Sequence, residues 1–260
     1  MRLIRALLLA LASAMVAAAV TYVVAIRPKV RAWGVEPGEA DLSLPGDDLI
    51  AEPSATETRG IDISAPPASV WPWLVQMGYE RGGWYSYDAM DQKHPSADTI
   101  MPEFQSLQAG DILPFGVGSG FRAAVVEPER ALVLYLDTEL ARELLDKAVA
   151  EGEMPEPGRT SFPEFAVSWA FFLQPSEGGT RLVERFRAKT PGNAAAHAVL
   201  GEIMGTGIVL MTRKQMLGIK ERVESPSSGA SLSELTDEAA DQLELIANGE
   251  GQPESERMGV

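Results

Sequence analysis

Polar and apolar residues alternate in the segment TETRGIDISAPP, residues 56–67, and this period of two predicts a strand with one buried side. In PASVWPWLVQM, residues 67–77, the period lengthens to that of a helix. The apolar positions that set this spacing are Val70, Trp73, Leu74 and Met77. Gly78 is well placed to end the helix, because glycine readily adopts the backbone conformation that follows a helix C-terminus.

Short apolar runs return after residue 110 and predict a series of antiparallel strands. The runs are DILPFGV (111–117), FRAAVVEPER (121–130), ALVLYLD (131–137), VSWAFFLQ (167–174) and TRLVERFRAK (180–189). Connections such as PSEGG, residues 175–179, are typical of hairpins, since glycine supplies the positive φ that a tight turn needs. Residues 138–165 begin with a charged helical pattern and continue as a Pro- and Gly-rich loop, which indicates an insertion between two strands.

The longest helical pattern of the folded region covers residues 193–224. Its broad apolar face consists of Ala196, Leu200, Ile203, Ile208, Met211, Met216 and Ile219. Gly201, Gly205 and Gly207 interrupt the first half, and each costs about 1 kcal/mol relative to alanine inside a helix. They indicate a kink, a close approach by another backbone or a ligand, or a loop that divides the segment into two helices.

An uncharged apolar run from Ala6 to Ile26 precedes the folded region, with basic residues on both sides. At about 1.5 Å per residue this run just crosses a hydrocarbon core of about 30 Å. The alternative is a cleaved signal peptide, but VTYVVAI, residues 20–26, stays apolar beyond the small residues 17–19. We therefore expect an anchor at 1–31 and a single-pass protein of the cell membrane. The basic flanks nearly balance, so the side of the soluble part stays open.

Two polar segments flank the periodic region. Residues 32–55 are rich in Pro, Gly, Asp and Glu without apolar periodicity, so we expect a linker that buries too little surface to become ordered. Residues 225–260 carry eight acids against one arginine, within a formal net charge of −15, and are expected to form an acidic, largely disordered tail. The folded domain therefore spans 56–224.

The order of elements is a strand, a helix, an irregular segment, a run of antiparallel strands and one long helix. This order predicts an α+β domain in which a curved antiparallel sheet is wrapped around the C-terminal helix, because each has one apolar face to bury. With the apolar run at 6–26, a single transmembrane helix would precede that domain.

Two stretches give the chain its resemblance to a known superfamily. TRGIDISAPPASVWPWLVQMG, where a strand runs through APP into the first helix, and SWAFFLQP with GGTRLVERFR before the final helix resemble the helix-grip superfamily of START-related proteins, also called SRPBCC or polyketide cyclase/dehydrase-like. GGWYSYD resembles a membrane-tethered bacterial subgroup without assigned activity. The resemblance covers about residues 56–224. It implies a cavity between sheet and final helix for apolar or amphipathic small molecules, and the insertion at 138–165 departs from it.

Composition excludes several kinds of chemistry. Without cysteine the chain has no disulfide, thiolate nucleophile or zinc–thiolate site, and its net charge argues against nucleic acid as a partner. His94 is best explained as a solvated loop residue, although beside Asp91 and Asp98 it could bind a metal or move a proton. His197 is best explained as a capping or surface residue. We expect no metal and no cofactor.

The segment RGGWYSYDAM, residues 81–90, concentrates three aromatic rings and an aspartate behind two glycines. The glycines allow a sharp turn that can aim the rings inward, where large amphipathic rings grip apolar ligands. The same rings can instead close the end of the core, with Asp88 capping a helix. The candidate ligand-binding residues are Trp84, Tyr85, Tyr87, Asp88, Tyr135, Trp169, Phe171, Met204 and Met211.

Three functions fit these patterns. The leading hypothesis is non-catalytic binding of a hydrophobic small molecule or lipid by a membrane-tethered helix-grip domain. The second is an enzyme of the cyclase or dehydratase kind, with Tyr85, Tyr87, Asp88 or His94 orienting a polyketide-like substrate. The third is a protein-interaction module that docks through the acidic tail and the insertion.

Overall fold

The computed structural model describes residues 13–15, 17, 21–22, 32–91, 94–155, 163–192 and 194–225, without the side chains of 90, 91 and 194–207. Its strands are β1 (Ala55–Ile63), β2 (Ile112–Gly116), β3 (Ser119–Glu127), β4 (Ala131–Asp137), β5 (Ala166–Ser176) and β6 (Gly179–Lys189). Its α-helices are α3 (Pro67–Val75), α4 (Asp88–Asp91), α5 (Thr138–Ala150) and α6 (Ala194–Glu224), with short 3-10 turns η2 (Glu39–Asp41), η3 (Asp47–Ile50) and η4 (Pro102–Phe104).

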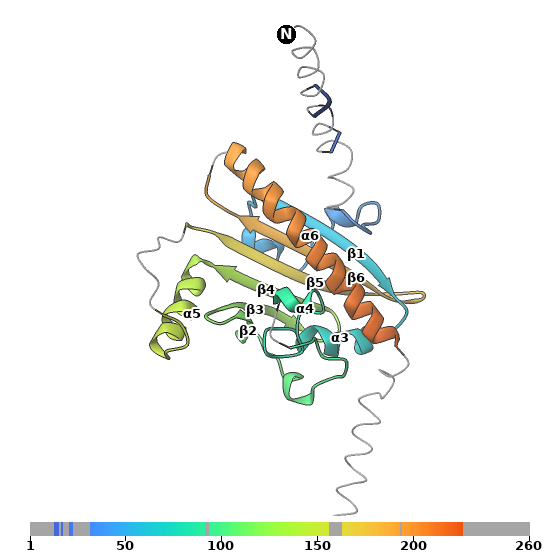
Figure 1. Ribbon diagram of the computed structural model, residues 1–260. Coiled ribbons are helices and arrows are strands. Elements are labelled where there is room, and N and C mark those ends of the chain that lie inside the picture. Colours follow the sequence, from blue (N-terminus) through green and yellow to red (C-terminus); the bar gives the residue numbers. More distant parts are fainter. Residues whose placement is uncertain are drawn as a thin grey trace, which may run out of the picture.

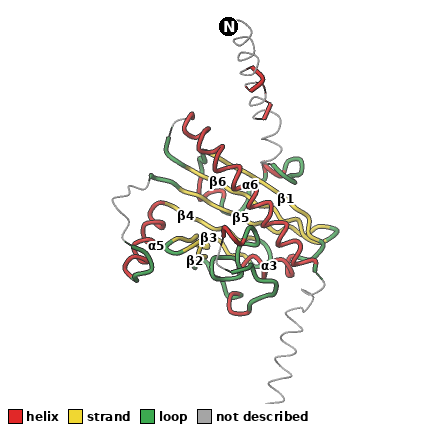
Figure 2. The backbone as a smooth tube through the Cα atoms, in the orientation of Figure 1, coloured by secondary structure: helices red, strands yellow, loops and turns green. Residues whose placement is uncertain are grey.

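The six strands form one antiparallel sheet in the order β1-β6-β5-β4-β3-β2. Helix α6 lies across one face of this sheet, and α3 packs beside it against β5 and β6 (Figures 1 and 2). The α+β class, the antiparallel sheet and the long final helix are therefore confirmed. Helix α6 runs unbroken from Ala194 to Glu224, so its glycines do not divide it into two helices.

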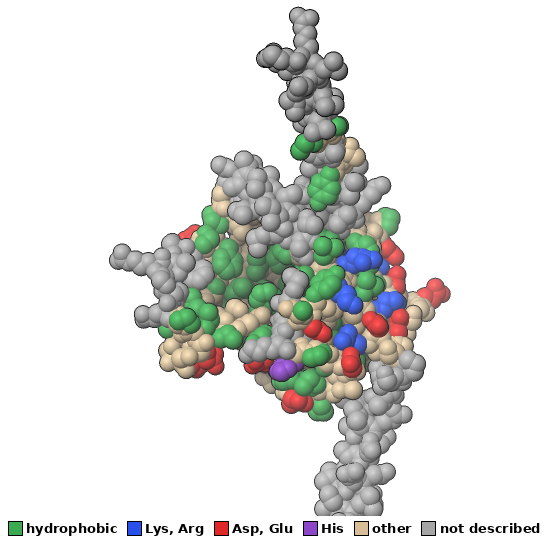
Figure 3. All heavy atoms as spheres, in the orientation of Figure 1, with side chains coloured by type: hydrophobic (Ala, Val, Ile, Leu, Met, Phe, Trp, Pro, Cys, Tyr) green, Lys and Arg blue, Asp and Glu red, His purple; other side chains and the backbone are tan. Residues whose placement is uncertain are grey.

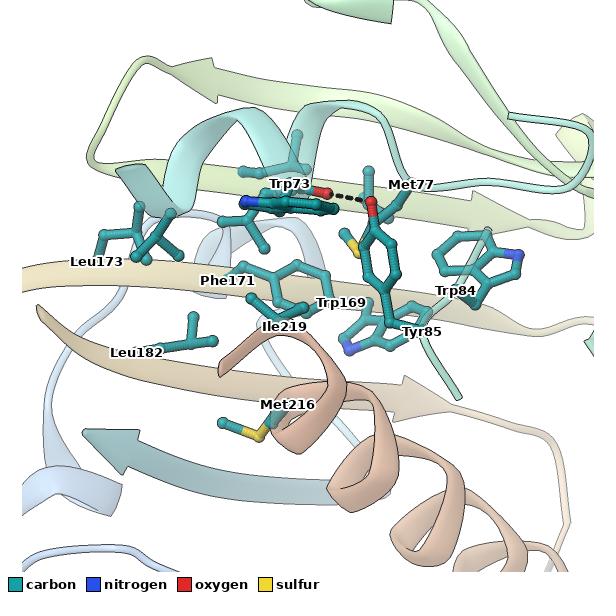
Figure 4. Close-up of a cluster of buried hydrophobic side chains, with 14 of the residues drawn as sticks. Trp73, Met77, Trp84, Tyr85, Trp169, Phe171, Leu173, Leu182, Met216 and Ile219 are labelled. Carbon is teal, nitrogen blue, oxygen red and sulfur yellow. Dashed lines mark hydrogen bonds between the residues drawn. The ribbon is translucent and has the colours of Figure 1, made fainter. Parts of the chain in front are cut away.

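We call the face that carries α3 and α6 the inner face. Side chains from α3, the sheet and the second half of α6 pack together there and form the main core (Figure 4). All four apolar positions that predicted α3 are buried: Val70, Trp73, Leu74 and Met77. Met216 and Ile219 of α6 are fully buried against this cluster. In this part of the fold side chains fill the space between sheet and helix, so the hollow expected from the sequence does not lie here.

The opposite, outer face is covered by residues 32–54, which we call the strap. Leu44 and Ile50 are buried, and Gly46 lies against the side chain of Val133. Ion pairs join the strap to the sheet: Glu39 with Arg181 at 2.8 Å, and Asp47 with Arg185 at 2.7 Å. The expectation that this segment buries too little to become ordered is wrong, because buried arginines of β6 supply a second source of stabilisation that periodicity does not show.

The helical start expected after residue 138 is present as α5, whose first turn is capped by the Asp137 side chain, accepting from the Leu140 amide at 2.9 Å. This helix contacts β3 and β4 and lies apart from α6 (Figure 1). Within the described part of the chain, no helix has the length and apolar character needed to span a membrane. The expected anchor falls almost entirely outside the described residues, as does the tail from 226 onward.

Candidate functional site

A row of aromatic rings runs along the inner face from solvent into the core. Phe115 on β2 is 50% exposed, and its ring contacts Trp84 edge-on at 6.1 Å between centroids. Trp84 stacks on Trp169 of β5 at 5.4 Å and 15° between planes. Phe121 of β3 and Phe171 of β5 flank Trp169 at 5.8 and 5.1 Å. We call these five residues the aromatic row.

The loop that carries Trp84 is held by local glycine geometry. The Gly78 and Gly83 backbones pair with each other, and Gly83 has a positive φ of 83°, which glycine adopts without strain. Tyr85 also has a positive φ, 57°, and its amide donates to Ser96 Oγ at 3.1 Å. Helix α6 approaches so closely that a Cβ at Gly218 would lie 2.4 Å from the Tyr85 carbonyl oxygen. A close approach between α6 and another backbone thus occurs at Gly218, which is not one of the three glycines singled out in the sequence.

Beside the aromatic row, the inner face holds a group of buried charged side chains. Glu57 and Arg59 lie on β1 and Glu184 lies on β6, directly opposite Arg59. Arg59 and Glu184 are 0% exposed and Glu57 is 8% exposed. Arg59 Nη2 is paired with Glu57, while its Nη1 stands 3.8 Å from Glu184 Oε1. We call Glu57, Arg59 and Glu184 the polar cluster.

Trp169 connects the aromatic row to the polar cluster. Its indole Nε1 donates a hydrogen bond to Glu184 Oε1 at 2.6 Å. The register of β5 and β6 places Phe171 opposite Glu184, so apolar rings and charged groups are adjacent on one surface. A binding site for an amphipathic molecule combines an apolar surface with a few polar groups in this way.

Several buried polar atoms of the polar cluster and the aromatic row make no hydrogen bond within the described part of the chain. Arg59 Nε and Nη1, Glu184 Oε2 and Trp84 Nε1 are buried and have no hydrogen-bond partner among the described residues. Buried polar groups are paired in the large majority of cases, because an unpaired one loses its hydration without compensation. Burial also raises the pKa of Glu184 to about 7, against the opposing effect of Arg59 and of the Trp169 hydrogen bond. A perturbed carboxyl with a free oxygen is a candidate functional group.

Four other polar candidates, three from residues 81–90, which we call the aromatic loop, and His94 after it, do not join the polar cluster. The Tyr85 hydroxyl donates to the Trp73 carbonyl at 3.1 Å (Figure 4), and burial raises the pKa of this phenol. Asp88 accepts from Ser96 Oγ at 2.6 Å at the start of α4. Tyr87 is 45% exposed, and His94 is exposed. Tyr85 and Asp88 line one surface cleft, but Tyr87 and His94 do not, so the four groups do not converge in one cavity.

The remaining candidates from the sequence are divided between the two faces. Trp84, Trp169 and Phe171 belong to the aromatic row of the inner face. Tyr135 lies on the outer face, since its neighbour Leu134 pairs with Trp169 while Tyr135 pairs with Ser168. Met211 of α6 is half-buried, and its carbonyl accepts from Ser86 Oγ at 3.1 Å. The side chain of Met204 lies outside the description.

Sequence reasoning missed the polar cluster, although a signal was present. Arg59 occupies the same phase of its strand as Ile61 and Ile63, and Glu184 the same phase as Leu182 and Phe186. A charged residue in the apolar phase of a strand is buried with its neighbours, because side chains alternate between faces.

One surface cleft of the described residues is lined largely by polar and charged side chains. A cleft of about 500 Å³ lies between the aromatic loop and the end of α6, with Asp98, Glu221 and Arg222 in its wall. Arg222 donates to the Ala97 carbonyl at 2.7 Å and pairs with Asp98 at 3.2 Å. Charged residues here gather over the second half of α6 (Figure 3). Among the described residues no group of three or more His, Asp or Glu could hold a metal ion.

In this chain one long helix crosses one face of a six-stranded antiparallel sheet. No family model matches the chain and no curated protein matches it. Similar solved structures include a protein from Mesorhizobium loti, at 16% identity, 65% of this chain, 97% of that chain and a TM-score of 0.34. The Polyketide_cyc-like protein from Corynebacterium glutamicum is 15% identical over 65% of this chain and 86% of its own, with a TM-score of 0.26.

A further similar structure is the di-domain ARO/CYC protein BexL from the BE-7585A biosynthetic pathway. It is 16% identical, over 68% of this chain and 53% of its own, with a TM-score of 0.35. Polyketide cyclase-like proteins are thus among the solved structures that this chain is similar to. The likeness concerns the fold and identifies neither a ligand nor a reaction.

Proposed function

We propose that the protein binds a largely apolar small molecule against the aromatic row, without catalysing a reaction. One observation carries the proposal: the aromatic row runs from the half-exposed ring of Phe115 to the buried Trp169. Exposed aromatic surface that continues into buried rings gives an apolar molecule a surface to bind. The hydrogen-bonding atoms left unused beside Trp169 provide its orientation.

The alternative of a cyclase or dehydratase built on the aromatic loop finds no support in the geometry. Its four residues, Tyr85, Tyr87, Asp88 and His94, are bonded to the protein itself or exposed. A general acid or base must reach the proton that it moves. Binding therefore remains the function that the described residues favour.

A neutral fluorescent probe, N-phenyl-1-naphthylamine, tests the proposal on the full-length chain. We expect saturable binding that Phe115→Ala weakens about fivefold, since an aromatic contact is worth about 1 kcal/mol. Leu49→Ala is the matched control, because Leu49 is 39% exposed but belongs to the strap on the outer face. Non-saturable uptake, or equal affinity in both variants and the wild type, would contradict the proposal.

Tethering to a membrane through residues 6–26 remains a proposal from the sequence. A tether would hold the binding surface near a bilayer, where apolar molecules accumulate and from which the ligand could be taken up. Flotation of the full-length chain with phospholipid vesicles checks it, and recovery of the intact protein in the vesicle-free fraction would contradict it.

A further inference from the structure

We propose that the bound molecule carries a neutral, oxygen-bearing group, such as a hydroxyl, which enters the polar cluster, and that molecules ending in a carboxylate are rejected. The inference rests on the proposed function and narrows its ligand to one chemical class. It follows from the charges of Glu57, Arg59 and Glu184 and from the atoms that they leave unused.

The first step is the charge of the cluster. Two carboxyl groups face one guanidinium, and Glu57 already pairs with Arg59. All three side chains are buried, so little solvent screens an additional charge. A ligand anion placed beside Arg59 would also stand beside Glu184, whose Oε1 is 3.8 Å from Arg59 Nη1.

The second step is the position of the other cations. The arginines of β6 lie on the outer face, where Arg181 pairs with Glu39 and both Arg185 and Arg187 pair with Asp47 of the strap. On α6, Arg222 pairs with Asp98. Among the described residues, then, these cations are committed to partners away from the polar cluster. An incoming carboxylate would therefore find none of these cations beside it to balance its charge.

The third step is the match of donors and acceptors. Arg59 offers unused N–H groups at Nε and Nη1, and Glu184 offers Oε2. A hydroxyl can accept from Arg59 and donate to the carboxylate of Glu184, or accept from the carboxylic acid when Glu184 is protonated. It therefore satisfies the cluster in either protonation state. A purely apolar molecule would leave all of these atoms unpaired.

Two flat molecules of the same size separate these cases: 2-naphthol, which is neutral at pH 8, and 2-naphthoate, which is an anion. Calorimetric titration of the full-length chain at pH 8 should show 2-naphthol binding at least about tenfold more tightly, as expected when one ligand meets an unbalanced buried charge. Naphthoate binding as tightly as naphthol, or more tightly, overturns the inference and leaves the proposed function intact.

Two variants locate the preference in the polar cluster. Glu184→Gln keeps the side-chain volume and removes the negative charge, so the ratio of the two affinities should fall to about threefold or less. Arg59→Met should weaken 2-naphthol binding about tenfold, because the hydroxyl loses its donors. Glu177→Gln, an exposed residue of the β5–β6 turn, is the matched control and should leave the ratio unchanged.

The outcomes remain distinguishable if Arg59→Met fails to fold, because Glu184→Gln alone tests the charge argument. An unchanged affinity ratio in folded Glu184→Gln overturns the inference. If N-phenyl-1-naphthylamine binds the wild type and neither naphthalene derivative does, the inference fails while apolar binding stands. If none of the three binds saturably, the proposed function fails with it.

Discussion

The two faces of the sheet bury arginines in opposite ways. On the outer face each guanidinium nitrogen of Arg185 donates a hydrogen bond, to Thr58, Asp47 and carbonyl oxygens of the strap. On the inner face Arg59 is more deeply buried and yet has two nitrogens without a partner among the described residues. A buried charge that is fully paired fixes a segment in place. A buried charge that is partly unpaired lowers stability, and binding sites are where such a loss persists.

The largest expected effect comes from removing an ion pair between the strap and the outer face. Glu39→Ala removes the two Glu39 carboxylate contacts of Arg181, at 2.9 and 2.8 Å, and leaves the buried guanidinium with the exposed Asp62, at 3.4 Å, as its remaining carboxylate partner. We expect the free energy of unfolding to fall by about 3 kcal/mol. Urea denaturation followed by tryptophan fluorescence measures it. Glu52→Ala, at an exposed strap residue, should change it by less than about 0.5 kcal/mol, and equal losses in the two variants would refute the comparison.

On the inner face, removing a charge should raise the free energy of unfolding instead of lowering it, and the effect should depend on pH. The folded pKa of Glu184, about 7, lies above its usual value of 4.5, so between these values the folded state holds a proton that the unfolded state has released. The contribution of Glu184 to stability is therefore fully present below about pH 4.5 and is lost as pH rises to about 7, a decline of up to about 3 kcal/mol. Glu184→Gln should lack this decline and be more stable than the wild type at pH 8.

Urea denaturation at several pH values measures this decline. The difference between wild type and Glu184→Gln isolates the contribution of Glu184 from that of other titrating groups. Glu177→Gln serves as control and should parallel the wild type. Parallel curves for Glu184→Gln and wild type would mean that Glu184 is an ordinary paired carboxylate.

The smallest expected effect comes from a buried polar group of the inner face that does have a hydrogen-bond partner. Tyr85 is buried like Trp84, but its hydroxyl is paired with the Trp73 carbonyl. We expect Tyr85→Phe to cost about 1 kcal/mol of stability and to leave the affinity for N-phenyl-1-naphthylamine unchanged. Tyr87→Phe, at the exposed neighbour, should change neither quantity. A weaker affinity of folded Tyr85→Phe for N-phenyl-1-naphthylamine would show that the Tyr85 hydroxyl takes part in binding.

The elements that could be predicted from the sequence are those that neighbouring residues specify through a periodic pattern. The helical spacing of Trp73, Leu74 and Met77 and the hairpin around residues 175–179 can be recognised from neighbouring residues alone, because one buried face repeats at a fixed period. The long final helix followed from the same argument, and the element order then pointed to the sheet that it crosses.

The strap and the polar cluster depend on pairs that are distant in sequence. Glu39 meets Arg181 across 142 positions, and Arg59 meets Glu184 across the β1–β6 pairing. No periodic pattern joins such residues, so the strap looked like a linker and the cluster like ordinary strand polarity. The aromatic loop was singled out for its composition, yet only Trp84 of its three rings belongs to the aromatic row.

The strap also decides where a fragment of this protein can begin. A recombinant domain started at Thr56 would retain every strand and all of α3, α5 and α6, and would look complete by secondary structure. It would nevertheless remove Glu39 and Asp47, the strap partners of Arg181 and Arg185, and expose the apolar patch that Leu44 and Ile50 cover. Material for crystallisation should therefore start no later than Ala32.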